Sequence, residues 1–264
     1  MTLQLLISTM NQTDYTLLDK MNVQSAAVVV NQCDRSSVDT FEYNGHSIKW
    51  ICVPERGIGR SRNTCLMNAS ADIVLFADDD IRYNDGYAER VLSAFESNSR
   101  ADVICFNIKL ENSTKNIGKH RDNQSCKRLH TFNAMRYGAP LIAARRKALF
   151  RERVSFSLIF GGGAEFGSGE DSIFIKDCLK SGLKLYSDTY YLGSVDDSSS
   201  SWFKGINDQF YIDRGMAYAV MFTRIRRLIF AYYSIRLANQ NGKYNIRRIY
   251  TLFIKGEKIF KAYR

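Results

Sequence analysis

Short apolar runs recur through the first 110 residues, and their pattern constrains the fold more than any other feature of the sequence. The runs occupy residues 3–9, 25–32, 47–53, 71–77 and 101–110. They lack strict alternation of apolar and polar positions, which is typical of strands covered on both faces. Two segments with helical spacing, 58–69 and 86–95, separate the later runs. This order predicts an α/β fold with a mostly parallel central sheet flanked by helices.

The rest of the chain divides at about residue 202. A polar excursion covers 111–135, and regular structure returns at 139–149. A glycine-rich loop at 160–169 then precedes a helix that we expect to begin near Glu170 and to end at Gly182. We predict an α/β domain over 1–202, with halves of about 1–110 and 111–202, and a helical extension over 203–264.

Composition excludes several classes of protein. With 264 residues, 45% of them hydrophobic, and only 2 prolines, the chain can bury a large core, and disorder is a poor interpretation. The 6 cysteines are scattered without a C-x-x-C pair and there are only 3 histidines, which argues against zinc. We find no secretory leader and no apolar run near the roughly 18 residues of a membrane span. We therefore expect a cytoplasmic location.

The net charge of +10 is distributed unevenly. Residues 203–264 contain 13 Lys and Arg against 3 Asp and Glu, whereas residues 1–202 contain 24 of each. A neutral body argues against the continuous phosphate-binding track of a nucleic-acid binder. The sequence therefore predicts no nucleic-acid partner and a basic extension with a function of its own.

Three adjacent carboxylates, Asp78, Asp79 and Asp80, follow the apolar run 71–77 directly. In an extended segment Asp78 and Asp80 face one way and Asp79 the other. Oxygen ligands of this kind suit Mg²⁺ or Mn²⁺, which bind one or two carboxylates together with substrate phosphates. A solvated acidic turn is the plainer alternative. Ligands of parallel sheets bind beyond the carboxyl ends of the strands, where Asn11, Asn31 and Asp78 are predicted to lie.

Two segments together resemble a known enzyme family. In "ERGIGRSRNTCLMNASADIVLFADDDI", Gly57, Arg62 and Asn63 are followed at a fitting distance by Asp78 and Asp80. In "SGEDSIFIKDCLKSGLKLYSD", a Glu-Asp pair opens a helix that a glycine and a strand follow. The chain thereby resembles the inverting, nucleotide-sugar-dependent glycosyltransferases of the large family 2 type over roughly residues 3–190. The resemblance implies a GT-A fold, which is Rossmann-like.

The resemblance also implies a role for each carboxylate. The metal, Mn²⁺ or Mg²⁺, would be held by Asp80 with Asp78 and would bind the diphosphate of a nucleoside-diphosphate sugar. Asp78 would also lie near the ribose or the donor sugar, and Asp79 is a further candidate for a sugar hydroxyl. Asp171 would be the general base for a single inverting displacement, with Glu170 as the alternative. Capping of the helix start by acidic side chains is the structural alternative for this pair.

The nucleotide end departs from the family pattern. Where the family has an aspartate for the base, the second strand ends in Asn31 and Gln32. Thr9 and Asn11 match at the end of the first strand, but the usual stacking aromatic residue is missing. Uridine is the favoured base, with Arg62 as a second contact. Trp202 is a weak candidate for the acceptor, and Asp196 and Asp197 stand where the family often has a metal-assisting histidine.

The basic extension predicts an amphipathic helix over 216–238 with Arg226 and Arg227 opposite one apolar face. That face would comprise Met221, Ile225, Leu228, Ile229, Tyr232 and Ile235. The helix could lie on an anionic membrane or pack on the body. For the terminal stretch, "IRRIYTLFIKGEKIFKAYR", we favour the membrane surface. The sequence thus predicts a transferase that serves a glycan or lipid-linked acceptor of the cell surface, peripheral on the inner face of the cell membrane.

Two other functions remain possible from the sequence. A sugar nucleotidyltransferase also uses paired aspartates and a metal, but it would need a glycine-rich N-terminal loop with basic residues. "ISTMNQTD" offers none. A non-enzymatic basic module that binds membranes or nucleic acid is supported by the sequence pI of about 9.3. The sequence leaves open which sugar is transferred, to which hydroxyl, and whether Glu170 or Asp171 is the base.

Overall fold

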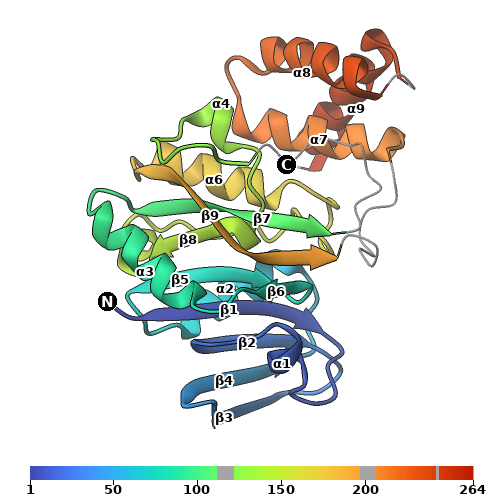
Figure 1. The fold of residues 1–264 in the computed structure, drawn as a ribbon. Coiled ribbons are helices and arrows are strands. Elements are labelled where there is room, and N and C mark those ends of the chain that lie inside the picture. The colour runs from blue at the N-terminus through green and yellow to red at the C-terminus, as the bar shows by residue number, and fades with distance from the viewer. Residues whose placement is uncertain (112–121, 197–205, 242–243, 264) are drawn as a thin grey trace.

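A computed structural model describes residues 1–111, 122–196, 206–241 and 244–263 (Figure 1). Its centre is a nine-stranded sheet with the order β3-β4-β2-β1-β5-β8-β7-β9-β6. The strands are β1 (Leu3–Met10), β2 (Ala26–Gln32), β3 (Ser37–Tyr43), β4 (His46–Val53), β5 (Ile73–Asp78), β6 (Ile81–Tyr83), β7 (Val103–Glu111), β8 (Ile142–Arg145) and β9 (Leu185–Asp196).

The predicted parallel strands form the part of the sheet that carries the acidic run. β4, β2, β1 and β5 are neighbours and run parallel. Their register sets Thr9 beside Asn31 and Ser8 beside Asp78. The carboxyl ends of these strands therefore meet at one edge, as the sequence predicted, and the α/β fold class is confirmed.

Three strands are antiparallel additions that the sequence analysis did not predict. β3 pairs with β4 across the turn at Asn44 and Gly45, whose φ angles of 50° and 77° fit a type I′ hairpin. The Asn-Gly dipeptide was a readable signal for that hairpin. β8 runs antiparallel to β5 and β7, and β6 runs antiparallel to β9. The parallel character of the sheet thus holds mainly in its N-terminal half.

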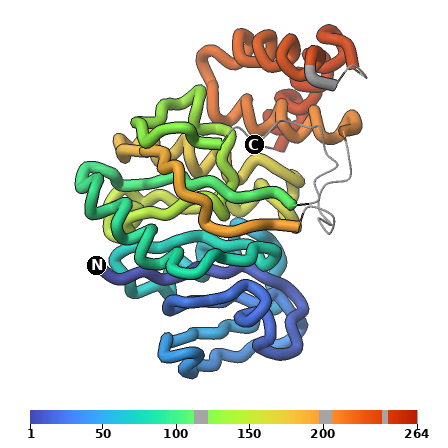
Figure 2. The backbone as a smooth tube through the Cα atoms, viewed as in Figure 1, coloured from blue at the N-terminus to red at the C-terminus, as the bar shows by residue number. Residues whose placement is uncertain are grey.

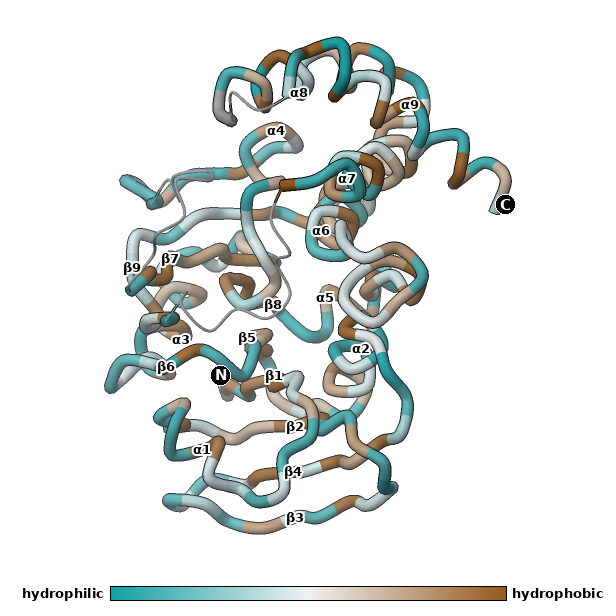
Figure 3. Tube along the Cα trace, turned by 90° about the vertical axis from the view of Figure 1, so that its right-hand side faces the viewer, coloured by the Kyte–Doolittle hydropathy of each residue, from teal (hydrophilic) through white to brown (hydrophobic). Residues whose placement is uncertain are grey.

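Helices cover both faces of the sheet. α1 (Leu17–Lys20) and α3 (Tyr87–Ser97) lie on one face, and α2 (Ile58–Asn68), α5 (Arg146–Arg151) and α6 (Glu170–Lys180) lie on the other (Figure 3). The helices predicted at 58–69, at 86–95 and from Glu170 onward are thereby confirmed. Short helical turns, α4 (Thr131–Ala134) and η1 (Ala139–Leu141), border the same end of the sheet as the acidic run.

The C-terminal extension forms a second helical layer. α7 (Asp208–Met221), α8 (Arg226–Asn241) and α9 (Ile246–Tyr263) stack at the end of the molecule farthest from β3 (Figure 2). They share a hydrophobic cluster with Phe160, Phe166 and Ile173, which belong to the glycine-rich loop and to α6. None of the described helices is long and apolar enough to cross a bilayer.

Two predictions for this extension were wrong. The helix expected over 216–238 is broken between Met221 and Arg226, so the six apolar positions do not share one face. Ile229 is buried, whereas Leu228 is exposed. The apolar side of α9 is buried against α7 through Ile249, Leu252 and Phe253 instead of lying on a membrane. The burial of apolar area between two helices explains this packing.

A buried carboxylate fixes α8 to α9. Glu257 pairs with Arg226 Nε at 2.7 Å, with an Arg227 nitrogen at 3.0 Å and with Lys261 Nζ at 2.7 Å. Burial opposes ionisation of Glu257, but the three cations outweigh it and lower the pKa of the carboxyl. The pairing holds the first turn of α8 in place.

We predict that Gly256→Ala loosens the extension. A Cβ at this position would lie 2.1 Å from the carbonyl oxygen of Ile212 on α7, so the helices would have to separate. Overpacking of this kind costs about 1–3 kcal/mol of unfolding free energy. Urea unfolding would measure it. Lys255→Ala, at an exposed neighbouring position, is the matched control and should change stability by less than about 0.5 kcal/mol. Equal stability of both variants would contradict the close packing.

Candidate active site

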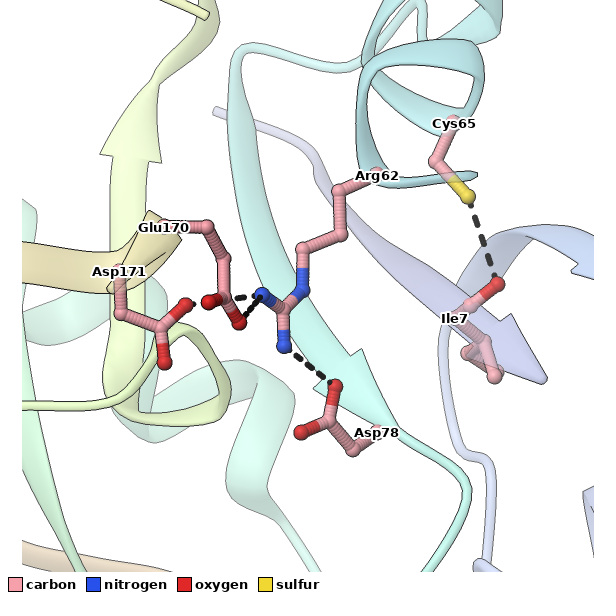
Figure 4. Close-up of polar contacts among 6 residues, drawn as sticks. All are labelled: Ile7, Arg62, Cys65, Asp78, Glu170 and Asp171. Carbon is pink, nitrogen blue, oxygen red and sulfur yellow. Dashed lines mark hydrogen bonds and ion pairs between the residues drawn. The ribbon is translucent and has the colours of Figure 1, made fainter. Parts of the chain in front are cut away.

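Arg62 is the centre of the candidate site (Figure 4). One guanidinium nitrogen donates to Asp171 Oδ1 at 2.8 Å and to Glu170 Oε1 at 3.3 Å. The other donates to Asp78 Oδ1 at 2.9 Å. The side chain is almost fully buried, and its three carboxylate neighbours raise its pKa against the opposing effect of burial. Arg62 therefore joins the two acidic motifs that the sequence singled out.

The start of α2 aims Arg62 at these carboxylates. Gly57 precedes the helix at a φ of 124°, and the Ile58 N–H donates to the carbonyl of Gly162. Asn63 exchanges two hydrogen bonds with the backbone of Phe156, at 2.8 and 2.9 Å. The guanidinium carbon of Arg62 lies 5.2 Å from the Phe156 ring centroid. The glycine-rich loop and the ring thus hold the arginine from one side while the acids hold it from the other.

The start of α6 presents the Glu-Asp pair. Gly169 precedes it at a φ of 115°, and both acids occupy the first helical turn, where the helix dipole favours negative charge. Burial raises the pKa of Asp171 to about 7, Arg62 opposes the rise, and Glu170 and Asp78 add to it. A carboxyl that changes protonation near neutral pH is suited to general acid–base chemistry. Helix capping and catalysis are compatible here.

The acidic run is a turn rather than an extended segment. β5 ends at Asp78, so Asp79 and Asp80 do not continue the predicted alternation. Asp79 Oδ2 accepts a hydrogen bond from the Thr9 hydroxyl at 2.6 Å, and burial raises the pKa of Asp79. Asp80 is exposed at the cleft wall. The three carboxylates thus have three different environments.

A divalent cation fits this turn only with help from a substrate. Among the described residues, no group of three or more His, Cys, Asp and Glu side chains is arranged to hold a metal ion on its own. Asp80 faces the cleft, and Arg62 engages only one oxygen of Asp78. Proteins usually bind Mg²⁺ through one or two carboxylates, and substrate phosphates supply further oxygen ligands. The residues present therefore fit an ion that arrives with a diphosphate.

The site opens into a cleft of about 1800 Å³ that is lined by described residues from both layers of the molecule. One arm lies at the strand ends and is bordered by Thr9, Gln32, Arg56 and Asp78. Further lining residues come from the segment 122–138, from α7 and from α8, and we call the part of the cleft that they border the distal arm. Glu170, Asp171 and Arg62 lie on the wall that both arms share. The cleft can therefore hold two substrates that meet at the carboxylates.

The structure argues against three of the predicted nucleotide contacts, Asn31, Asn11 and Arg62. Asn31 is fully buried, and its amide exchanges hydrogen bonds of 3.0 and 2.9 Å with the backbone of Gln12. Asn11 does not border the cleft. Gln32, the next residue on β2, borders it instead and accepts from the Gly57 N–H at 2.7 Å. Arg62 is held by carboxylates rather than presented to a base. Because successive side chains of a strand point to opposite faces, the sequence could have predicted that only one of Asn31 and Gln32 faces the cleft.

The distal arm contains residues that the sequence analysis missed. Its described residues include four cationic side chains, Lys127, Arg136, Arg214 and Arg236. Besides the Glu-Asp pair, they include one acidic side chain, Asp122, and the aromatic rings of Phe132 and Tyr232. No local motif marks these positions, because they come together only when the helical layer packs on the sheet domain. Trp202 and Asp197 lie outside the described residues, and Asp196, at the end of β9, does not line the cleft.

One protein family has a model that matches part of this chain. Residues 28–155 match the model of glycosyl transferase family 2. The matched region contains Arg62 and the acidic run, whereas Glu170 and Asp171 lie beyond it. Among curated proteins, none is significantly similar to this chain.

Solved structures match nearly the whole chain. S. aureus TarS 1-349 in complex with UDP-GlcNAc is 17% identical, with a TM-score of 0.70, and the match covers 98% of this chain and 80% of that one. Its complex with UDP gives a TM-score of 0.66 at 17% identity, with 97% and 81% covered. A structure of S. aureus TarS gives 0.61 at 15% identity, with 93% and 44% covered. The shared fold is the GT-A glycosyltransferase fold, with the C-terminal helices included in the match.

Proposed function

We propose that this glycosyltransferase, whose residues 28–155 belong to glycosyl transferase family 2, moves a sugar from a UDP-sugar to an acceptor hydroxyl by a single inverting displacement. The observation that carries the proposal is the contact of Arg62 with Asp78 on one side and with Glu170 and Asp171 on the other. It brings the donor-side acid and a candidate base to one point of the cleft, as a direct displacement requires.

The donor would occupy the arm at the strand ends. Gln32 and Thr9 border the place for the nucleoside, and Asp80 with the outer oxygen of Asp78 would hold Mn²⁺ or Mg²⁺ against the diphosphate. The ion would neutralise negative charge on the departing nucleoside diphosphate. Asp79 is tied to Thr9, so its role is to fix the turn rather than to bind the ion.

Asp171 would act as the base. Its carboxylate takes the proton of the acceptor hydroxyl as that oxygen bonds to the anomeric carbon, and the bond from this carbon to the phosphate oxygen breaks. Attack opposite to the leaving group inverts the anomeric centre. Asp171 is preferred to Glu170 because burial raises its pKa to about 7, which suits proton uptake at neutral pH. Arg62 orients both carboxylates.

The acceptor would occupy the distal arm. Its four cationic side chains favour an anionic acceptor, such as a lipid-linked glycan precursor with a phosphate near the sugar, and Phe132 and Tyr232 can stack on sugar rings. This chemistry supports a role in assembling cell-surface polysaccharide at the inner face of the cell membrane.

Donor binding is testable without knowing the acceptor. At a concentration about 100 times the dissociation constant, UDP-sugar with Mn²⁺ should raise the melting temperature by about 5–10 °C. Asp80→Ala should lose most of this shift, whereas Glu96→Ala, an exposed acid on α3, should keep it. A thermal-shift series of nucleotides with and without metal makes the measurement. Absence of any nucleotide response in any metal would refute the proposal.

A further inference from the structure

Helix α8 has an apolar face that the fold leaves uncovered. Ile225, directly before the helix, and Leu228, Tyr232 and Ile235 on it follow one another at helical spacing and are 44%, 71%, 52% and 50% exposed. We call these four residues the α8 stripe. The opposite side of the helix, with Ile229, Phe230 and Tyr233, is buried in the helical layer. A contiguous exposed apolar stripe on an otherwise packed helix marks an interaction surface.

The charge around the α8 stripe identifies its partner. Residues 214–256 contain nine Lys and Arg and no Asp or Glu. Arg224 and Arg236 are exposed beside the stripe, and Arg227 remains half exposed although it pairs with Glu257. An apolar stripe flanked by cations is the pattern of a helix that lies in the interface of an anionic bilayer.

A second copy of the chain is a poorer occupant. A symmetric dimer through the α8 stripe would bring the same arginines of both copies together. Glu257, the carboxylate that pairs with two of these arginines, is buried and already holds Arg226, Arg227 and Lys261. Phospholipid headgroups supply the missing negative charge, and acyl chains cover the apolar side chains.

We infer that the α8 stripe docks the protein on the surface of an anionic membrane, with the distal arm of the cleft facing the bilayer. Tyr232 belongs both to the stripe and to the wall of the distal arm, and Arg236 lines the same arm. Figure 1 places α8 as the outermost helix of its layer. Docking would bring the arm to the depth of lipid headgroups, so the acceptor enters sideways from the membrane. The acceptor part of this inference rests on the proposed function, whereas the docking part does not.

Vesicle flotation of the full chain tests the docking. Wild-type protein should float with vesicles of phosphatidylcholine and phosphatidylglycerol, should not float with phosphatidylcholine alone, and should be released by high salt. Leu228→Ser with Ile235→Ser should reduce the floating fraction about tenfold. Met67→Ser is the matched control, because Met67 is 70% exposed on α2, and it should float as the wild type does.

Three results would overturn the inference. Wild-type protein could fail to float with anionic vesicles, or the Leu228/Ile235 variant could float like the wild type. The stripe could also hold a dimer, seen by sedimentation as a wild-type dimer that the variant loses. If the double variant is unfolded by circular dichroism, Arg224→Glu replaces it and should also weaken flotation. The nucleotide thermal shift is measured without vesicles, so failure of donor binding and failure of docking are distinguishable.

Discussion

Arg62→Met should destabilise the protein by about 3–5 kcal/mol at neutral pH and abolish transfer. The change leaves Asp78, Glu170 and Asp171 clustered without their shared cation. It also removes the group that opposes the rise in the pKa of Asp171. That carboxyl then takes up a proton at a higher pH than in the wild type, so the defect in unfolding free energy should shrink as pH falls from 8 to 5.

Chemical denaturation across this pH range measures the effect. Arg151→Met is the control, since Arg151 forms an exposed ion pair with Glu152 and should cost less than about 1 kcal/mol. Arg62→Lys should be intermediate, because one ammonium cannot reach all three carboxylates as the guanidinium does. A stability defect of Arg62→Met that is small, or that grows toward acid pH, would contradict the role of Arg62 as the shared cation.

Asp171→Asn should lower turnover about 10²- to 10⁴-fold while donor binding stays intact. The amide keeps the size of the carboxyl but cannot take the acceptor proton. Turnover is followed as release of UDP from the donor that stabilises the protein, with an extract of lipid-linked glycans as acceptor. Glu170→Gln is the matched control and should retain more activity. Near-normal turnover of Asp171→Asn would assign the base to Glu170.

The same variant has a signature in the metal-free, nucleotide-free protein. The pKa of Asp171 is raised from 3.8 to about 7 on folding, so the cost of ionising it is absent below the unfolded value and complete above the folded value. The unfolding free energy of the wild type should therefore fall relative to that of Asp171→Asn as pH rises from about 4 to about 7. A stability difference that is constant over this range would show that folding does not raise the pKa of the Asp171 carboxyl.

Much of the site could be predicted from the sequence, because its parts are local. The acidic run directly follows an apolar strand, and the Glu-Asp pair opens a helix after a glycine-rich loop. Local sequence patterns could not predict which side chains these residues contact in the folded protein. Arg62 was expected at the nucleotide and instead joins three carboxylates, and Asn31 is buried because its side chain points away from the cleft.

The remaining errors come from packing between segments that are distant in the sequence. Helical spacing continues through "MFTRIRR", so the break between α7 and α8 was invisible to periodicity. The apolar face of α9 is equally compatible in sequence with a bilayer and with a neighbouring helix. Gly215 on α7 and Gly256 on α9 permit these two helices to approach closely, and no periodic pattern shows that these two positions meet. The domain boundary near residue 202 and the residue roles stay predictions.

The shared arginine also governs when a working centre can exist during biosynthesis. Arg62 and Asp171 are 109 positions apart, and Asp78 emerges long before the helix that carries the other two acids. A nascent chain that stops short of α6 can form the parallel strands, yet its guanidinium meets a single carboxylate. The three carboxylates can therefore gather around Arg62 only after α6 has been synthesised, and a product that ends before Glu170 lacks both candidate bases.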